Sequence, residues 1–79
     1  MVLEERLRGV FVQALELEDG VDPGVIRYRN HPRWDSLGHM TLIVAMESEF
    51  DVEIGPEQLI EIDCFDAAVK VLRDVGAHG

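Results

Sequence analysis

The chain has little positive charge, one cysteine and no long hydrophobic run. Sixteen aspartates and glutamates stand against seven lysines and arginines, which gives a formal net charge of −9. A chain this acidic is not drawn by charge to nucleic acid or to anionic lipid, so we expect neither as a partner. It suits partners with basic docking faces instead. No uninterrupted apolar stretch approaches the length of a membrane span, so we expect no membrane segment.

The single cysteine, Cys64, cannot form an internal disulfide. A reducing, cytoplasmic setting is therefore the default expectation, with Cys64 as a small buried apolar residue. The first residues, Met1-Val2-Leu3-Glu4-Glu5, become acidic at once, whereas a signal peptide begins with basic residues. This start also favours a cytoplasmic protein.

The length of 79 residues predicts a single domain, residues 1–79, and a monomer. Such a chain buries a modest core and has little room for an enclosed active-site cleft. Apolar residues make up 47% of the sequence, which is enough for the chain to fold.

Apolar residues at helical spacing predict an all-α fold, a small four-helix bundle with three main helices and one short helix. The expected helices run from about Val2 to Leu17, from Asp35 or Ser36 to Phe50, from Pro56 to Ile60, and from an N-cap at Asp63 to about Val75. Asp19-Gly20 is the expected end of the first helix. A long loop, Val21–Trp34, joins the first two helices, and its expected anchors are Val25, Ile26, Tyr28 and Trp34.

The expected second helix carries two apolar stripes. Ile43, Met46 and Phe50 form the stripe that should face the core. The other stripe is made of Leu37, Met40 and Val44. It is displaced around the helix, so we expect part of it to be exposed in so thin a bundle.

Ser36 lies in an Asp35-Ser36-Leu37 motif at the start of this helix. A serine there holds its hydroxyl outside the core, near the free backbone N–H groups of the first turn, which favour a neighbouring anion such as a phosphate. Ser36 is therefore well placed to carry a phosphodiester and less well placed to act as a buried nucleophile. The alternative is that Ser36 is only the N-cap, although Asp35 can cap the helix and leave the serine hydroxyl free.

From Leu3 to Leu72 the chain resembles the acyl carrier proteins. The resemblance rests on Asp35-Ser36-Leu37, on the segment Phe50-Asp51-Val52-Glu53-Ile54 and on the stretch Ile62–Leu72. It implies that Ser36 bears 4′-phosphopantetheine from CoA, with Asp35 flanking the site, and that the chain is not itself an enzyme. The implied partners are a phosphopantetheinyl transferase, an acyl-loading ligase or acyltransferase, and downstream enzymes such as a ketosynthase. The resemblance also implies that Leu37, Met40, Val44 and Glu47 contact these partners.

Some positions depart from that family's usual pattern. Gly38 and Thr41 stand where the family often has carboxylates, and the loop carries Arg27, Arg29, His31 and Arg33. The string Trp34–Met40 is similar to discrete carriers of specialised pathways, such as polyketide or other secondary-metabolite biosynthesis. The resemblance therefore favours a specialised carrier, with a peptidyl or aminoacyl carrier as the alternative. The cargo stays open among aminoacyl, glyceryl, malonyl-type and fatty acyl groups.

Two further alternatives belong to other classes of protein. The first is an unmodified helical adaptor that binds a partner through Leu37, Met40 and Val44. The second is a small serine hydrolase, but Asp35, Ser36 and His39 lack a third group placed to orient the imidazole and show no oxyanion site.

The remaining polar candidates have simpler expected roles. His31, His39 and Cys64 lack a recognisable metal-ligand spacing, so we expect no metal site. His39 is expected to be half-buried or to contact the prosthetic arm, and Trp34 to anchor the loop. Arg27, Arg29 and Arg33 are read as solvated charges. The alternative is that one of these arginines contacts the phosphodiester or a phosphate of CoA.

Overall fold

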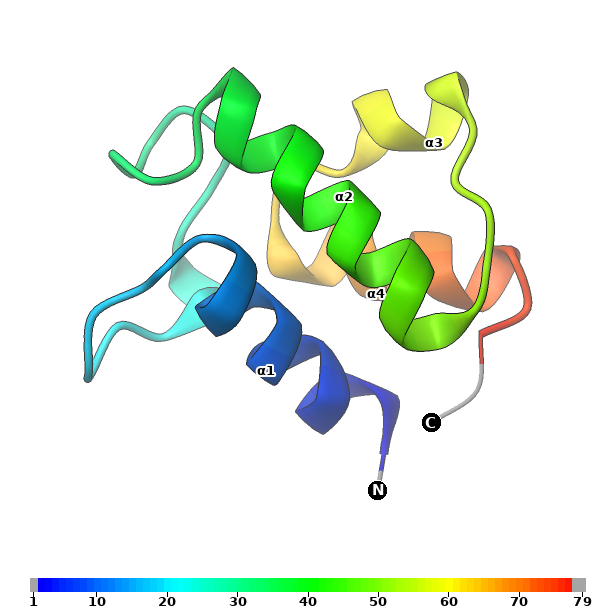
Figure 1. Cartoon of the computed structure of the whole chain (residues 1–79), viewed down its shortest axis with the longest axis horizontal. Coiled ribbons are helices and arrows are strands. Elements are labelled where there is room, and N and C mark those ends of the chain that lie inside the picture. Colours follow the sequence, from blue (N-terminus) through cyan, green and yellow to red (C-terminus); the bar gives the residue numbers. More distant parts are fainter. Residues whose placement is uncertain (1, 78–79) are drawn as a thin grey trace.

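The structure, a computed structural model that describes residues 2–77, contains four α-helices and one 3₁₀ turn (Figure 1). The elements are α1 (Leu3–Ala14), η1 (Pro23–Val25), α2 (Ser36–Phe50), α3 (Pro56–Glu61) and α4 (Phe65–Asp74). The described residues form no β-strand. The sequence-based prediction of a small all-α bundle with three main helices and one short helix is therefore confirmed. No helix within residues 2–77 combines the length and the apolar character that crossing a membrane requires.

The helices form a thin bundle. α1 packs along α2 and runs in the opposite direction, α4 lies behind α2 in the view of Figure 1, and α3 lies beside the first half of α2. The shortest extent of the molecule is 18 Å, which is about two helix diameters. Every helix therefore keeps one face toward solvent, and the core is a single layer of side chains between the helices.

Aromatic rings occupy the centre of that core. The Phe11 ring of α1 packs edge-to-face with the Trp34 ring, and the two centroids are 5.2 Å apart. Phe11 makes a similar contact with the Phe65 ring of α4, with centroids 5.3 Å apart. All three side chains are buried, and Trp34 and Phe11 have no exposed surface at all. Edge-to-face ring pairs add about 0.5–1.5 kcal/mol each beyond the apolar area that they bury. The Trp34 side chain thus fixes the long loop to α1, as the sequence suggested, and Phe11 in turn packs against Phe65 of α4.

The end of α1 comes earlier than predicted. The helix ends at Ala14, and Glu16 takes the left-handed conformation with φ 49°. The Leu17 N–H donates to the Val12 carbonyl at 3.0 Å, and the Glu16 N–H donates to the Gln13 carbonyl at 3.4 Å. These two bonds make a Schellman motif, which here forms without glycine. The prediction of a helix to Leu17 was wrong because the reversal at Glu16 is what brings the Leu17 side chain into the core.

The segment before α4 also differs from the prediction. Cys64, not Asp63, is the N-cap of α4, and its side chain makes no capping hydrogen bond. The Asp63 carbonyl accepts the Tyr28 N–H at 2.9 Å, and Arg27 and Cys64 form an isolated antiparallel bridge. This pairing with the long loop explains why Asp63 is drawn away from a capping geometry. Cys64 is half-buried here, whereas the sequence suggested full burial.

The long loop is held at several points along its length. The Asp22 carboxylate accepts the Gly24 N–H at 2.8 Å and pairs with Arg8 of α1 at 2.6 Å. The backbone N–H of Gly24 and the Arg8 guanidinium hold the pKa of Asp22 below its ordinary value. Among the expected anchors, Ile26 is buried like Trp34 and Tyr28 is half-buried. Val25 is exposed, so its prediction as an anchor was wrong.

Gly38, in the first turn of α2, is where the loop backbone comes closest to the helix. A Cβ at this position would overlap with the carbonyl oxygen of Arg33 and press on the Leu15 side chain at 3.2 Å. Position 38 therefore has room only for glycine, which has a hydrogen atom in place of Cβ. The missing carboxylate at Gly38, which stood out in the sequence, has a steric cause.

We predict that Gly38→Ala lowers the free energy of unfolding by about 1–3 kcal/mol, because the loop must move away from α2. Gly9→Ala is the matched control, since Gly9 lies in α1 with open space around it. That control should raise the free energy by about 0.5–1 kcal/mol through helix propensity. Urea unfolding measures both. A Gly38→Ala protein as stable as the parent would show that the close approach is absent in solution.

Candidate functional site

The start of α2 presents a capped helix end with an exposed serine. Asp35 is the N-cap, and its carboxylate accepts the Gly38 N–H at 2.8 Å. Ser36 is the first residue of the helix, and its side chain is exposed. Because Asp35 serves as the cap, the serine hydroxyl is not used in holding the helix end. The Asp35 carboxylate is the one acidic group at this helix start, since the first turn of α2 itself contains no acidic residue.

One side chain contacts the Ser36 hydroxyl. The Tyr28 hydroxyl lies 3.3 Å from Ser36 Oγ, and either group can donate in this contact. The loop places Tyr28 there because its own backbone is bonded to Asp63 and its ring packs against Trp34 and His39. The sequence suggested Tyr28 only as a loop anchor. Eight positions separate Tyr28 from Ser36, and no local pattern indicates their contact.

His39 is buried and uses both ring nitrogens within the fold, so the prediction of a half-buried residue was wrong. The indole N–H of Trp34 donates to His39 Nδ1 at 2.9 Å. Because an indole nitrogen can only donate, Nδ1 must be the unprotonated nitrogen, and Nε2 carries the proton. Nε2 therefore donates to the Leu59 carbonyl, also at 2.9 Å. The imidazole ties the loop to α3 and has no nitrogen free to act as a base for Ser36.

The second apolar stripe of α2 lies entirely on the surface. The exposed fractions of Leu37, Met40 and Val44 are 77%, 49% and 60%. Ile60, on α3, is exposed to 78%, and it follows Leu59, which is bonded to α2 through His39. We call Leu37, Met40 and Val44 the apolar face. The sequence predicted partial exposure of the stripe and did not indicate Ile60, because a helix of about one turn has too few positions to show which side faces the core.

The acidic residues near the end of α2 are engaged within the fold. The Glu47 carboxylate accepts the Ile54 N–H at 2.8 Å and so holds the link between α2 and α3. Glu49 pairs with Arg6 of α1, with Nη2 and Oε2 3.1 Å apart. Glu47, which the resemblance implied as a partner contact, is half-buried and has a structural role here.

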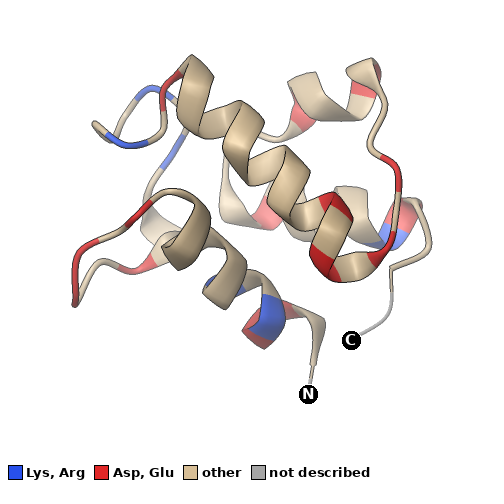
Figure 2. Ribbon diagram, viewed as in Figure 1, with Lys and Arg blue, Asp and Glu red and all other residues tan. Residues whose placement is uncertain are grey.

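Positive charge gathers in the loop before Ser36. Arg27, Arg29 and Arg33 are exposed, and residues 27–33 include no acidic residue. Figure 2 shows this blue segment beside the start of α2, while red segments dominate the rest of the ribbon. The guanidinium of Arg29 lies over the Tyr28 ring, 5.7 Å from its centroid. The site therefore combines an exposed serine hydroxyl, the tyrosine hydroxyl that contacts it and a basic loop.

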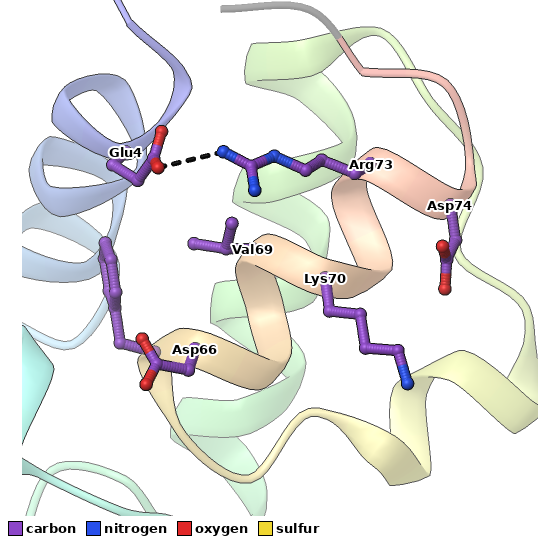
Figure 3. Close-up of a pocket in the computed structure, with 7 residues that line it drawn as sticks. Glu4, Asp66, Val69, Lys70, Arg73 and Asp74 are labelled. Carbon is purple, nitrogen blue, oxygen red and sulfur yellow. Dashed lines mark hydrogen bonds and ion pairs between the residues drawn. The ribbon is translucent and has the colours of Figure 1, made fainter.

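Among the hollows on the described surface are one at the site and one away from it. One, of about 210 Å³, borders the site and is lined in part by Arg33, Asp35, Leu37 and Thr41. The other, of about 410 Å³, lies between α1 and α4 and has the Glu4–Arg73 ion pair at one end (Figure 3). None of its lining residues comes from α2 or from the loop before it. Within residues 2–77 no three His, Cys, Asp or Glu side chains are placed to hold a metal ion.

Comparison with known proteins gives no family for this chain. No protein-family model matches it, and no solved structure gives a significant match. The site is therefore argued from its own geometry.

We predict that His39→Ala lowers the free energy of unfolding by about 2–4 kcal/mol, because the indole N–H and the Leu59 carbonyl both lose a buried partner. Met40→Ala, at the next position and on the surface, should change it by less than about 0.5 kcal/mol. Urea unfolding followed by fluorescence of the chain's one tryptophan measures the loss at the loop itself. Equal stabilities of the two variants would contradict this role of His39.

Proposed function

We propose that the chain is an acyl carrier protein and that Ser36 is the attachment point of 4′-phosphopantetheine. The observation that carries this proposal is the exposed Ser36 hydroxyl at the first position of α2, left free by the Asp35 cap. A helix start favours a bound phosphate through its backbone N–H groups. The sequence resemblance to acyl carrier proteins from Leu3 to Leu72 is the reason for proposing phosphopantetheine as the group attached to this hydroxyl.

The residues at the start of α2 fit the attached group. Ser36 Oγ would form a bond to the CoA phosphorus that bears the pantetheine arm, and the bridging P–O bond of the pyrophosphate would break. Adenosine 3′,5′-bisphosphate would leave, and the hydroxyl proton would pass to a base of the transferase. Ser36 is exposed, and the Asp35 carboxylate beside it is hydrogen-bonded to the Gly38 N–H. The thiol of the attached group then carries an acyl chain as a thioester. The chain itself supplies attachment, reach and recognition, and the chemistry belongs to its partners.

The cargo is best assigned to a specialised pathway, such as polyketide or related biosynthesis. Support comes from the basic loop and from the string Trp34–Met40. Gly38 does not bear on this question, because the Arg33 carbonyl excludes any side chain there. Thr41 is the other position where the expected carboxylate is missing, and its hydroxyl donates to the Leu37 carbonyl at 3.1 Å. An aminoacyl carrier is the alternative within the same class.

The partners of such a carrier would meet the apolar face. They include the phosphopantetheinyl transferase, the acyl-loading ligase or acyltransferase, and a ketosynthase or other downstream enzyme. Leu37, Met40 and Val44 follow Ser36 along one side of α2 and are all exposed. Methionine side chains adapt to different partners, which suits a chain that several enzymes must recognise.

A helical adaptor that is never modified is the second candidate. The specific observation in its favour is the same apolar face, which an unmodified binding protein would use in the same way. The two candidates differ in the fate of Ser36, so modification of the serine separates them.

The test is the intact mass after incubation with a broad-specificity phosphopantetheinyl transferase, Mg²⁺ and CoA. We expect a gain of one phosphopantetheine unit in the parent protein and none in Ser36→Ala. The chain has one other serine, Ser48, which is exposed on the same helix, so Ser48→Ala is the matched control and should gain the unit like the parent. No gain in a folded parent protein would favour the adaptor, and a gain in Ser36→Ala would refute the site.

The apolar face gives a second test. Leu37→Ser should slow the modification by about tenfold or more, because a central apolar anchor of an interface contributes at least about 1.4–2 kcal/mol to recognition. Val12→Ser is its control, since Val12 is an exposed valine on α1, outside the apolar face. Initial rates measured at low carrier concentration report the difference. Equal rates for the two variants would place recognition elsewhere on the molecule.

A further inference from the structure

The basic residues of this chain divide into two groups. Arg6, Arg8 and Arg73 each form an ion pair with a carboxylate. Arg27, Arg29, Arg33 and Lys70 form none within the described chain, and the three arginines lie in a single loop of seven residues. In a chain of net charge −9, exposed arginines that take no part in these ion pairs are available to an anion from outside the fold.

The backbone of this loop is fixed before any ligand arrives. Arg29 has φ 70°, a conformation that residues other than glycine seldom adopt. It is held there by its N–H, which donates to the Trp34 carbonyl at 2.8 Å, and by the turn in which the Asn30 N–H donates to the Arg27 carbonyl at 3.0 Å. Strained residues that the surrounding structure holds in place occur preferentially at functional sites. The rigid backbone lowers the entropy lost when the Arg29 side chain binds.

A line of contacts leads from Arg29 to the serine. The Arg29 guanidinium lies 5.7 Å from the centre of the Tyr28 ring, and the Tyr28 hydroxyl lies 3.3 Å from Ser36 Oγ. The oxygens of a phosphate on Ser36 would therefore lie beside the Tyr28 hydroxyl. The Arg29 guanidinium lies over the ring of the same tyrosine. Guanidinium and phosphate form paired, charge-assisted hydrogen bonds, so the side chain gains by turning from the ring to the phosphate.

We propose that Arg29 and Tyr28 form a phosphate-binding site that holds the phosphodiester carried by Ser36. The Arg29 guanidinium donates to the unbridged phosphate oxygens and the Tyr28 hydroxyl donates to the same group, while Arg27 makes no contact with the phosphate. This inference rests on the proposed function, because it needs a phosphate on Ser36. As a consequence of this binding, the phosphodiester end of the prosthetic arm is held on the loop side of α2, and the arm leaves the surface in a defined direction.

The test uses the full chain converted to its modified form, with intact mass as the first readout. The ³¹P resonance of the phosphodiester and the side-chain Nε–H resonance of Arg29 are then measured by NMR. We expect the Arg29 resonance to shift on modification, and the ³¹P resonance of Arg29→Gln and of Tyr28→Phe to move toward that of free phosphopantetheine. Arg27→Gln removes the same charge from the same loop and should leave the ³¹P resonance unchanged.

A second arm separates the two sources of phosphate. Ser36→Ala is titrated with CoA: a shift of the Arg29 resonance extends the site to the phosphates of CoA before transfer, and no shift limits it to the attached phosphodiester. If Arg29→Gln and Tyr28→Phe both keep the ³¹P resonance of the modified parent protein, the phosphate-binding site is refuted while the carrier function stands. If the parent protein gains no mass, the phosphate-binding site and the carrier function are both refuted.

Discussion

The buried hydrogen bond from the Trp34 indole to His39 is the contact on which the rest of the site depends. Trp34 ends the long loop, and His39 stands one turn inside α2, so the bond closes the loop onto the helix that it precedes. The other nitrogen of His39 reaches the Leu59 carbonyl and adds α3 to the same unit. Buried polar groups must be satisfied in this way, because an unpaired donor in the core costs about 1–3 kcal/mol. The loop, α2 and α3 are thereby fixed relative to one another.

That arrangement accounts for the unusual composition around the serine. With the loop drawn onto α2, the Arg33 carbonyl occupies the space of a side chain at position 38, and glycine follows as a steric requirement. The same closure carries Tyr28 to the Ser36 hydroxyl and leaves the three arginines of the loop exposed and outside the ion pairs of the described chain. Structural and functional demands therefore act on one segment of about ten residues. A change in Trp34 or His39 would reach Ser36 without touching it.

The thinness of the bundle decides how the rest of the surface is used. A molecule two helices thick cannot bury both apolar stripes of α2, so one stripe goes to the core and the other to solvent. The exposed stripe begins next to the serine, which is where a protein that recognises Ser36 must approach. Glu47 and Glu49 lie further along the helix, and both carboxylates are occupied within the fold. Apolar contact, more than acidic charge, is what this side of α2 offers to a partner.

The sequence by itself determined the elements whose signals are local. The cap at Asp35, the proline that starts α3 and the apolar spacing along α2 each act within one or two turns, so the helices and the place of Ser36 could be predicted. The end of α1, the uncapped start of α4, the burial of His39 and the contact of Tyr28 with Ser36 could not. Each of these depends on which distant backbone group becomes a partner, such as the Asp63 carbonyl for Tyr28. Only the packing of the loop against α2 and α4 settles that choice, because hydrogen bonds between segments far apart in sequence leave no periodic trace in the chain.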